Sequence, residues 1–350
     1  MQNSNKVTTH PLSVKGLAAD YLRLMRIQLA GGMALPLIFG AISVNNLSFS
    51  AIAPLLIIGI LSGIYGFVLN DYLDVDVDKL SKDLSERSLV KGTVPKKAAI
   101  AIIILCFVFA YVTVFIFFFR DHILFFTGLS ILIVADVFAF IYNGYGKRLI
   151  GSDFLLALAQ SLYFLFAALV SLQDGTPGML TWVLFILVFN QLLFMNAISG
   201  GLKDADHDYL MNVKNIALAS GVKVTQDKKV IIPISFKAFG MGIRCFSVFL
   251  IFVPFVFYGM NYEFWQMILL IILVVILLYA SVAMLNIKIF NRNKLRKILV
   301  IQLFMWYSIL PIMLVSVVGL FYAFILIIFP FAWYIILSII IGEKPMEPQI

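Results

Sequence analysis

Charged residues are scarce in this chain: Asp, Glu, Lys and Arg make up only 13% of its 350 residues, whereas 62% of the residues are hydrophobic. The mean hydropathy is +1.03. A soluble fold cannot hide that much apolar surface, so the composition excludes a water-soluble globular protein and indicates an integral membrane protein. We expect no cleavable signal peptide, because the N-terminus is polar and no short apolar core precedes a small-residue cleavage site.

Cysteine and histidine are also rare, with two and three residues. Cys106 and Cys245 both lie in apolar runs, so we expect small core residues rather than a disulfide or a metal pair. His207 has no second histidine or cysteine at a supporting spacing and is interpreted as a bystander. The sequence therefore gives no indication of a thiolate or histidine-rich metal centre.

Long apolar stretches, by contrast, recur along the chain, each roughly 20 residues long and thus of membrane-spanning length. The run 298–341 is nearly uncharged, and we expect it to divide at Gly319. The sequence predicts an all-α bundle of nine or ten transmembrane helices over 23–341, with a polar N-terminal segment 1–22 and a C-terminal tail 342–350. The expected spans are residues 25–44, 48–70, 97–119, 122–142, 151–172, 178–199, 233–259, 264–287, 298–318 and 321–341.

The net charge of +8 comes from lysines and arginines that cluster in alternate loops, which is typical of membrane topology rather than of nucleic-acid binding. The basic side is expected to be cytoplasmic. We therefore predict a multi-pass protein of the plasma membrane, with a central cavity that opens at the cytoplasmic face and no nucleic-acid partner. The basic loops are 71–97, 143–150, 200–232 and 288–297.

Acidic and amide side chains follow the second apolar run, from Asn70 to Asp78. Residues four apart share one face of a helix, so Asn70, Asp74 and Asp78 align, and Asp71 lies beside them. Carboxylates this close repel one another unless a cation separates them. Magnesium suits the site, because it is usually held by a few carboxylates together with substrate phosphates. The spacing favours a diphosphate site at the membrane face over a solvated acidic loop, which needs no particular spacing.

A second acidic group extends from Lys203 to Asp208. Asp204 and Asp208 are four residues apart and share a face if the segment is helical, whereas Asp206 then points away. Alone, this pattern is equally consistent with a short acidic loop. It follows an even-numbered span, as the first group does, so both are expected at one membrane face. Two Mg²⁺ ions held by the two groups would clamp one diphosphate between them.

Other polar residues leave two interpretations open. Tyr142, Lys147 and Arg148 close the fourth span, where they either anchor the interface or serve the site, with Lys147 and Arg87 in contact with phosphate oxygens. Asp136 lies inside the same span and Arg244 inside the seventh. Ionisable groups at such depth default to a functional role, and the other interpretation of Asp136 is that it is protonated and hydrogen-bonds a neighbouring helix.

Several of these motifs resemble those of the UbiA superfamily of membrane prenyltransferases. The segment from Asn70 to Asp78 fits the family's first motif, NDxxDxxxD, in full, and Asp204-x-x-x-Asp208 fits the second in a short DxxxD form. Arg23 and Arg26 fit the basic entrance to the first span. Three further segments are similar to stretches of the family. Arg87–Val94 is similar to R-P-L-x-x-G-x-I, with Ser88 in place of proline. Tyr142–Ser152 is similar to Y-S-x-x-x-K-R followed by I-G-N, and Asn215–Ala217 is similar to T-L-A.

The resemblance covers about residues 20–320 and has departures. Many relatives have a third aspartate where this chain has Gly201, and a basic residue one turn earlier is absent near Asn196, Ser199 and Gly200. Ten spans also exceed the family's usual nine. These differences bear on the acceptor more than on the donor.

What the resemblance implies is Mg²⁺-dependent transfer of a prenyl group from a polyprenyl diphosphate. The acceptor is either an aromatic ring, as in quinone or haem pathways, or a polar lipid such as a prenylated glycerol phosphate. Asp74, Tyr142 and Lys147 are the expected catalytic residues, with Tyr142 facing the developing cation. The residues expected to bind the diphosphate are Arg26, Asn70, Arg87, Lys147 and Lys203. One metal is assigned to Asn70, Asp71, Asp74 and Asp78, and the other to Asp204 and Asp208.

Two other classes of protein remain as alternatives. A transporter would use Asp136 and Arg244 as intramembrane charges, and Arg244 is a candidate partner for Asp136. A transporter should, however, concentrate its polar groups near the midplane, whereas here they gather at one face. A non-catalytic membrane scaffold would leave the complete first motif unexplained.

Overall fold

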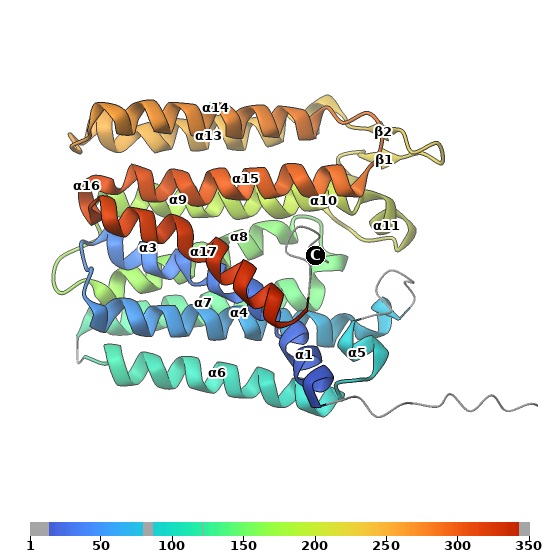
Figure 1. Cartoon of the computed structure of the whole chain (residues 1–350), viewed down its shortest axis with the longest axis horizontal. Helices are drawn as coiled ribbons and strands as arrows, with labels where there is room; N and C mark the ends of the chain where they lie inside the picture. The colour runs from blue at the N-terminus through green and yellow to red at the C-terminus, as the bar shows by residue number, and fades with distance from the viewer. Residues whose placement is uncertain (1–13, 80–86, 121, 343–350) are drawn as a thin grey trace, which may run out of the picture.

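Long helices running side by side make up nearly the whole structure, because a helix satisfies every backbone polar group within its own segment inside a bilayer (Figure 1). The computed structural model describes residues 14–79, 87–120 and 122–342. Within them, ten helical stretches are long and apolar enough to cross a membrane. The all-α membrane fold predicted from the sequence is therefore confirmed, at the upper of the two expected counts.

The N-terminal half contains the helices that carry the first acidic motif. Residues 1–13 of the expected N-terminal segment and residues 343–350 of the expected tail lie outside the described residues, and the first helix already begins at Val14. The elements are α1 (Val14–Leu24), α2 (Ile27–Met33), α3 (Leu35–Ser43), α4 (Phe49–Asp78), α5 (Ser88–Lys91), α6 (Lys96–Phe118), α7 (Ile123–Tyr145), the 3₁₀-helix η2 (Gly146–Arg148) and α8 (Ser152–Ser171).

The C-terminal half contains the second acidic motif and a two-stranded hairpin. Gly319, with a φ of 79°, separates α16 from α17, which is the break expected from the sequence. The elements are α9 (Met179–Leu193), the π-helix η3 (Phe194–Gly200), α10 (Gly201–Lys203), α11 (Ala205–Leu210), α12 (Ile216–Ala219), β1 (Lys223–Val224), β2 (Val230–Ile231), α13 (Ile234–Phe257), α14 (Phe264–Leu285), α15 (Arg292–Met313), α16 (Val315–Val318) and α17 (Leu320–Ile340).

Helix α8 lies at the centre of the bundle, and α6 and α17 lie at its surface. In the most apolar window of α8, 72% of the residues are buried, against 17% in α6 and in α17. Helix α3 approaches α8 closely at Gly40, where a Cβ atom would lie 2.3 Å from the carbonyl oxygen of Phe164. Glycine is therefore required at this crossing, and the outer helices present their remaining apolar side chains to lipid.

The short elements gather at one end of the bundle, where α5, α11 and the β1–β2 hairpin lie together with the end of α4 (Figure 1). The hairpin pairs Lys223 with Ile231 and Val224 with Val230. All three polar segments identified in the sequence belong to this end. The fold therefore collects them on one face of the membrane domain, as the alternation of spans predicts.

Candidate functional site

The first acidic motif lies on the last turns of α4, which continues as one helix to Asp78. Asp71 and Asp78 are buried, with 7% and 2% of their surface exposed, and the Asp74 side chain is 13% exposed. By contrast, the Asp76 side chain is 78% exposed and pairs with surface lysines. The helical register therefore turns the three motif aspartates inward and leaves Asp76 outside.

Basic side chains from distant segments surround these aspartates. Arg26 lies 2.7 Å from Asp71, measured from Nη2 to Oδ1. Arg87 pairs with both Asp71 and Asp78. Lys147 extends from η2 to Asp74, with 2.8 Å between Nζ and Oδ2, and lies 3.9 Å from Asp78. Three of the cations assigned to diphosphate thus lie against the carboxylates assigned to metal.

Arg26 reaches this position through an unusual backbone conformation. Its φ and ψ are both 44°, in the left-handed region, and it separates α1 from α2 within the first span. A non-glycine residue in this region costs about 1–2 kcal/mol, and the surrounding structure must hold it there. The Asp71 carboxylate and the ring of Phe67, 5.5 Å from the guanidinium carbon, provide that support.

The second acidic motif begins where η3 and α10 end. Asp204 precedes α11, and the N–H of Asp208 donates to the carbonyl oxygen of Asp204 over 2.9 Å, so the two residues are one helical turn apart. Asp206 instead binds Arg292 at the start of α15, with 2.7 Å between Nη2 and Oδ1. This is the orientation predicted for Asp206, and Lys203 lies 3.4 Å from Asp204.

Asn215 is a site residue to which the sequence reasoning gave no role. Its Nδ2 donates to Oδ2 of Asp208 over 2.7 Å, while its Oδ1 accepts from the N–H of Leu218 at the start of α12. The only sequence signal was its place in the stretch that resembles the family's T-L-A. Asn215 therefore fixes the Asp208 carboxylate relative to the following loop.

Lys147 connects the two motifs. Its carbonyl oxygen accepts from the N–H of Lys214 over 2.9 Å, which ties η2 to the loop after α11. Burial raises the pKa of Asp208 to about 6, and the negative charge of Asp204 acts in the same direction, whereas the Lys147 ammonium and Asn215 oppose the rise. Since Lys147 contacts Asp74 and also acts on Asp208, both motifs border the same polar region.

The donor set fits magnesium held jointly by protein and substrate. No three His, Cys, Asp or Glu side chains come together as a ready-made ion cage in the part of the chain that the structure describes. Asn70, Asp71, Asp74 and Asp78 therefore do not converge on one point by themselves. Magnesium commonly takes one or two carboxylates and completes its shell with phosphate oxygens and water. Such a shell suits carboxylates that are spread along one helix face.

Asp136 and Arg244 do not pair with each other, so the candidate partnership between them is wrong. Asp136 accepts hydrogen bonds from Tyr111 and Tyr163. Arg244 is fully buried, donates to Gln191 over 2.7 Å, and lies over the ring of Phe194. The position of both residues deep inside predicted spans marked them as unusual. Their partners, however, come from helices whose packing the sequence does not specify.

A buried polar network joins Arg244 to the π-helix that precedes the second motif. Ser281 accepts from Nε of Arg244 over 3.2 Å and from Gln302 over 3.3 Å, and Gln302 accepts from Ser199 in η3 over 3.2 Å. The guanidinium carbon lies 3.6 Å from the centroid of the Phe194 ring, also in η3. The network thus links η3, which leads into the second motif, to α13, α14 and α15.

We expect Ser281→Ala to lower the free energy of unfolding by about 1–3 kcal/mol, because it leaves buried donors of Arg244 and Gln302 without an acceptor. Ser247→Ala is the matched control. Ser247 is equally buried but donates only to Ile243 of its own helix, so its loss should cost less than about 1 kcal/mol. Denaturant unfolding in detergent measures both variants, and equal losses would contradict the network.

Comparison with known proteins agrees with this geometry. No curated protein matches the chain significantly. Among solved structures, digeranylgeranylglyceryl phosphate synthase is 19% identical with a TM-score of 0.62, over 87% of this chain and 98% of that one. A UbiA homologue from Aeropyrum pernix K1 is 14% identical with a TM-score of 0.62, over 84% and 98%. A UbiA homologue from Archaeoglobus fulgidus bound to DMAPP and Mg²⁺ is 18% identical with a TM-score of 0.58, over 84% and 99%.

At these identities, the solved structures establish the shared fold. The family assignment comes from the sequence itself, in which residues 33–289 match the UbiA prenyltransferase family. This region is well over half of the chain and includes both acidic motifs, Arg87 and Lys147. The chain is therefore an integral, multi-pass membrane protein that belongs to the UbiA prenyltransferase family.

Proposed function

We propose that residues 23–341 form a transferase domain that moves a prenyl group from a polyprenyl diphosphate to an acceptor within the membrane, with Mg²⁺ as cofactor. The observation that carries the proposal is the placement of Arg26, Arg87 and Lys147 against the aspartates at the end of α4. A site for a metal–diphosphate complex needs both charges in one place. The family assignment supports the same reaction class.

The metal ligands proposed from the sequence remain the best candidates. Asn70, Asp71, Asp74 and Asp78 would hold one ion, and Asp204 and Asp208 the other. When bound, Mg²⁺ would neutralise the diphosphate and stabilise it as a leaving group. The structural relative from Archaeoglobus fulgidus, which was solved with DMAPP and Mg²⁺, supports this use of the site.

The basic residues would exchange partners when substrate binds. Arg26, Arg87 and Lys147 each pair with a carboxylate here, and each has donors that suit phosphate oxygens. Arg87 forms both of its pairs through Nη1. A guanidinium has five N–H groups in a planar fork, so Arg87 can hold a carboxylate and still donate to phosphate. Lys203 is proposed for the diphosphate side of the second motif.

Transfer then follows from stabilisation of the departing charge. The bond between C1 of the prenyl chain and the diphosphate oxygen breaks, and the electron pair leaves with the oxygen. The allylic carbon bonds to the acceptor, which releases the proton of the bonding atom to the departing diphosphate or to water. Preorganised cations in a region that excludes water are the main source of rate enhancement in such a step. Tyr142, which lies one turn before Gly146, is proposed to face the developing cation.

Both classes of acceptor, aromatic and polar lipid, stay within the proposal. The decisive assay incubates the purified protein with labelled geranylgeranyl diphosphate, Mg²⁺ and either an aromatic acid, haem or geranylgeranylglyceryl phosphate. We expect a prenylated product with one class of acceptor. A transporter is less well supported, because Asp136 and Arg244 are each engaged by uncharged neighbours rather than by each other. We also propose that the basic loops and the site face the cytoplasm.

Activity is expected to need Mg²⁺ or Mn²⁺ and to be lost in excess chelator. The Mg²⁺ concentration for half-maximal activity should also rise as the pH falls below about 6. Asp208 has a raised pKa of about 6, so it is ionised above that pH, and below it protons compete with the metal for its carboxylate. Magnesium titrations at pH 7.5 and pH 5.5 measure the effect. The same half-maximal concentration at both values would remove Asp208 from the metal site.

A further inference from the structure

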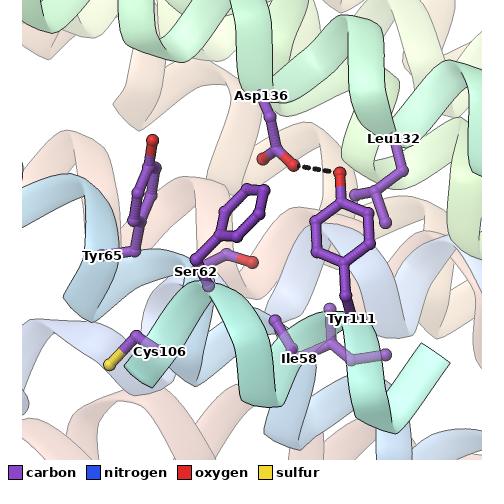
Figure 2. A pocket seen from close by; sticks show the side chains of 9 residues that line it. Ile58, Ser62, Tyr65, Cys106, Tyr111, Leu132 and Asp136 are labelled. Atoms are coloured by element: carbon purple, nitrogen blue, oxygen red, sulfur yellow. Dashed lines mark hydrogen bonds between the residues drawn. The ribbon is translucent and has the colours of Figure 1, made fainter. Parts of the chain in front are cut away.

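A second polar cluster lies in a cleft between α6 and α7, away from the acidic motifs. Helix α6 packs mainly against α4, and α7 packs mainly against α8, so α6 and α7 share few contacts and α4 forms the floor between them. Figure 2 shows the cleft, in which Asp136 extends from α7, Tyr111 from α6, and Tyr65 and Ser62 from α4. It therefore combines a carboxyl group with three hydroxyl groups inside an apolar wall.

Asp136 keeps hydrogen-bonding capacity beyond its two tyrosines. Tyr111 donates to Oδ2 over 2.6 Å, and Tyr163, from α8, donates to Oδ1. A carboxylate accepts about four hydrogen bonds, and no basic side chain pairs with Asp136 in the part of the chain that the structure describes. The Asp136 carboxyl oxygens therefore keep lone pairs that can accept from a further donor.

The hydroxyl groups of Tyr65 and Ser62 line the same cavity. Neither forms a hydrogen bond among the described residues, and the rings of Tyr65, Phe107 and Tyr111 pack in a row with centroid distances of 5.8 and 4.7 Å. The pocket therefore offers an acceptor, the Asp136 carboxyl group, beside two hydroxyl groups that can donate or accept. An incoming hydroxyl group would donate to Asp136 and accept from Tyr65 or Ser62.

This cleft is separate from the proposed transfer site. Tyr65 precedes Asp74 by nine residues on α4, which is about 13–14 Å along the helix axis and about two and a half turns. The two side chains therefore leave opposite faces of α4. A molecule bound beside Tyr65 would not contact the diphosphate side.

Depth and size restrict what can bind. Asp136 lies near the middle of the span Ile123–Arg148, where charged lipid head groups do not settle because leaving the interface costs too much free energy. The cavity holds about 10 Å³, which suits one water-sized group. Phe107 is 39% exposed, so an apolar chain can lie against it on the surface of α6.

We propose that the α6–α7 cleft binds the hydroxyl head of a neutral long-chain lipid alcohol, with its tail along the exposed surface of α6. The head would donate to Asp136, and Tyr65 and Ser62 would donate to its oxygen. This site is independent of the proposed transfer reaction.

The test uses the full-length protein in lipid nanodiscs and a diazirine-bearing C20 prenyl alcohol as the probe. We expect saturable labelling of peptides from α6 and α7. Unlabelled alcohol should compete at least about tenfold better than its methyl ether, which lacks the donor, since the ether leaves a buried carboxyl oxygen of Asp136 without its hydrogen bond. Equal competition by alcohol and ether would overturn the proposal.

Variants separate binding from a purely structural role of the tyrosines. Tyr65→Phe and Ser62→Ala leave the Tyr111–Asp136–Tyr163 contacts intact and should weaken labelling, whereas Ser130→Ala, on the exposed face of α7, should not change it. Labelling that is the same in Tyr65→Phe, Ser62→Ala and the unaltered protein would show that the cluster only holds helices together. Labelling should persist in Asp74→Asn, and its loss there would place the probe in the diphosphate site instead.

Discussion

Asp74→Asn is expected to reduce the rate of prenyl transfer by at least about 100-fold, because the substitution removes a carboxylate that we propose as a metal ligand and that pairs with Lys147. The fold should remain intact, since Asp74 lies on the last turns of α4 and contributes little to the apolar core. The measurement is single-turnover transfer of labelled prenyl groups at saturating Mg²⁺, together with thermal unfolding of the same preparation.

Asp76→Asn is the matched control for this variant. It changes the same residue type two positions further along the same helix, where the side chain is exposed and pairs with Lys79 and Lys96. We expect its activity to stay within about twofold of the unaltered protein, since exposed pairs of this kind contribute little. A folded Asp74→Asn protein with normal turnover would remove the metal assignment from this face of α4.

Asp208→Asn should likewise impair transfer by at least about 100-fold at limiting Mg²⁺, whereas Asp206→Asn should retain most of the activity. With Gly201 in place of a third aspartate, we propose that Asp204 and Asp208 hold the second ion, with phosphate and water in the remaining positions. Asp206 instead faces Arg292, and the loss of that half-exposed pair costs at most about 1 kcal/mol.

Comparison at limiting and saturating Mg²⁺ separates the two roles of these aspartates. A lost ligand should be partly compensated by more metal, so the defect of Asp208→Asn should shrink as Mg²⁺ rises. The defect of Asp206→Asn should not depend on Mg²⁺. If Asp206→Asn is the more damaging variant, the ligand assignment in the second motif is wrong, although the helical arrangement of Asp204 and Asp208 would stand.

The features that sequence reasoning predicted well are those with a local cause. The spacing of Asn70, Asp74 and Asp78 sets one helix face regardless of what packs nearby, and α4 does continue through them. Gly319 stops a helix because its positive φ suits glycine, and the expected division lies there.

The features that were missed depend on how helices rotate and approach one another. Arg244 finds Gln191 and Ser281, which are 53 and 37 residues away, because α9 and α14 happen to present polar groups at its depth. Asp136 accepts hydrogen bonds from Tyr111 and Tyr163, which also come from other helices. The left-handed conformation of Arg26 had no signal in the sequence, and its partner Asp71 is 45 residues away along the chain.

The π-helix η3 affects how the chain should be aligned and altered. A π-turn closes its hydrogen bonds from i to i+5 rather than from i to i+4, so residues 194–200 absorb one more residue per turn than an α-helix would. Any alignment or helical-wheel projection that extends α9 with uniform spacing assigns Asp204 and Asp208 to the wrong side. A single-residue deletion in 194–200 would therefore convert the π-turn into an α-turn and keep the second motif facing Lys147, whereas the same deletion within α9 would rotate that motif by about 100°.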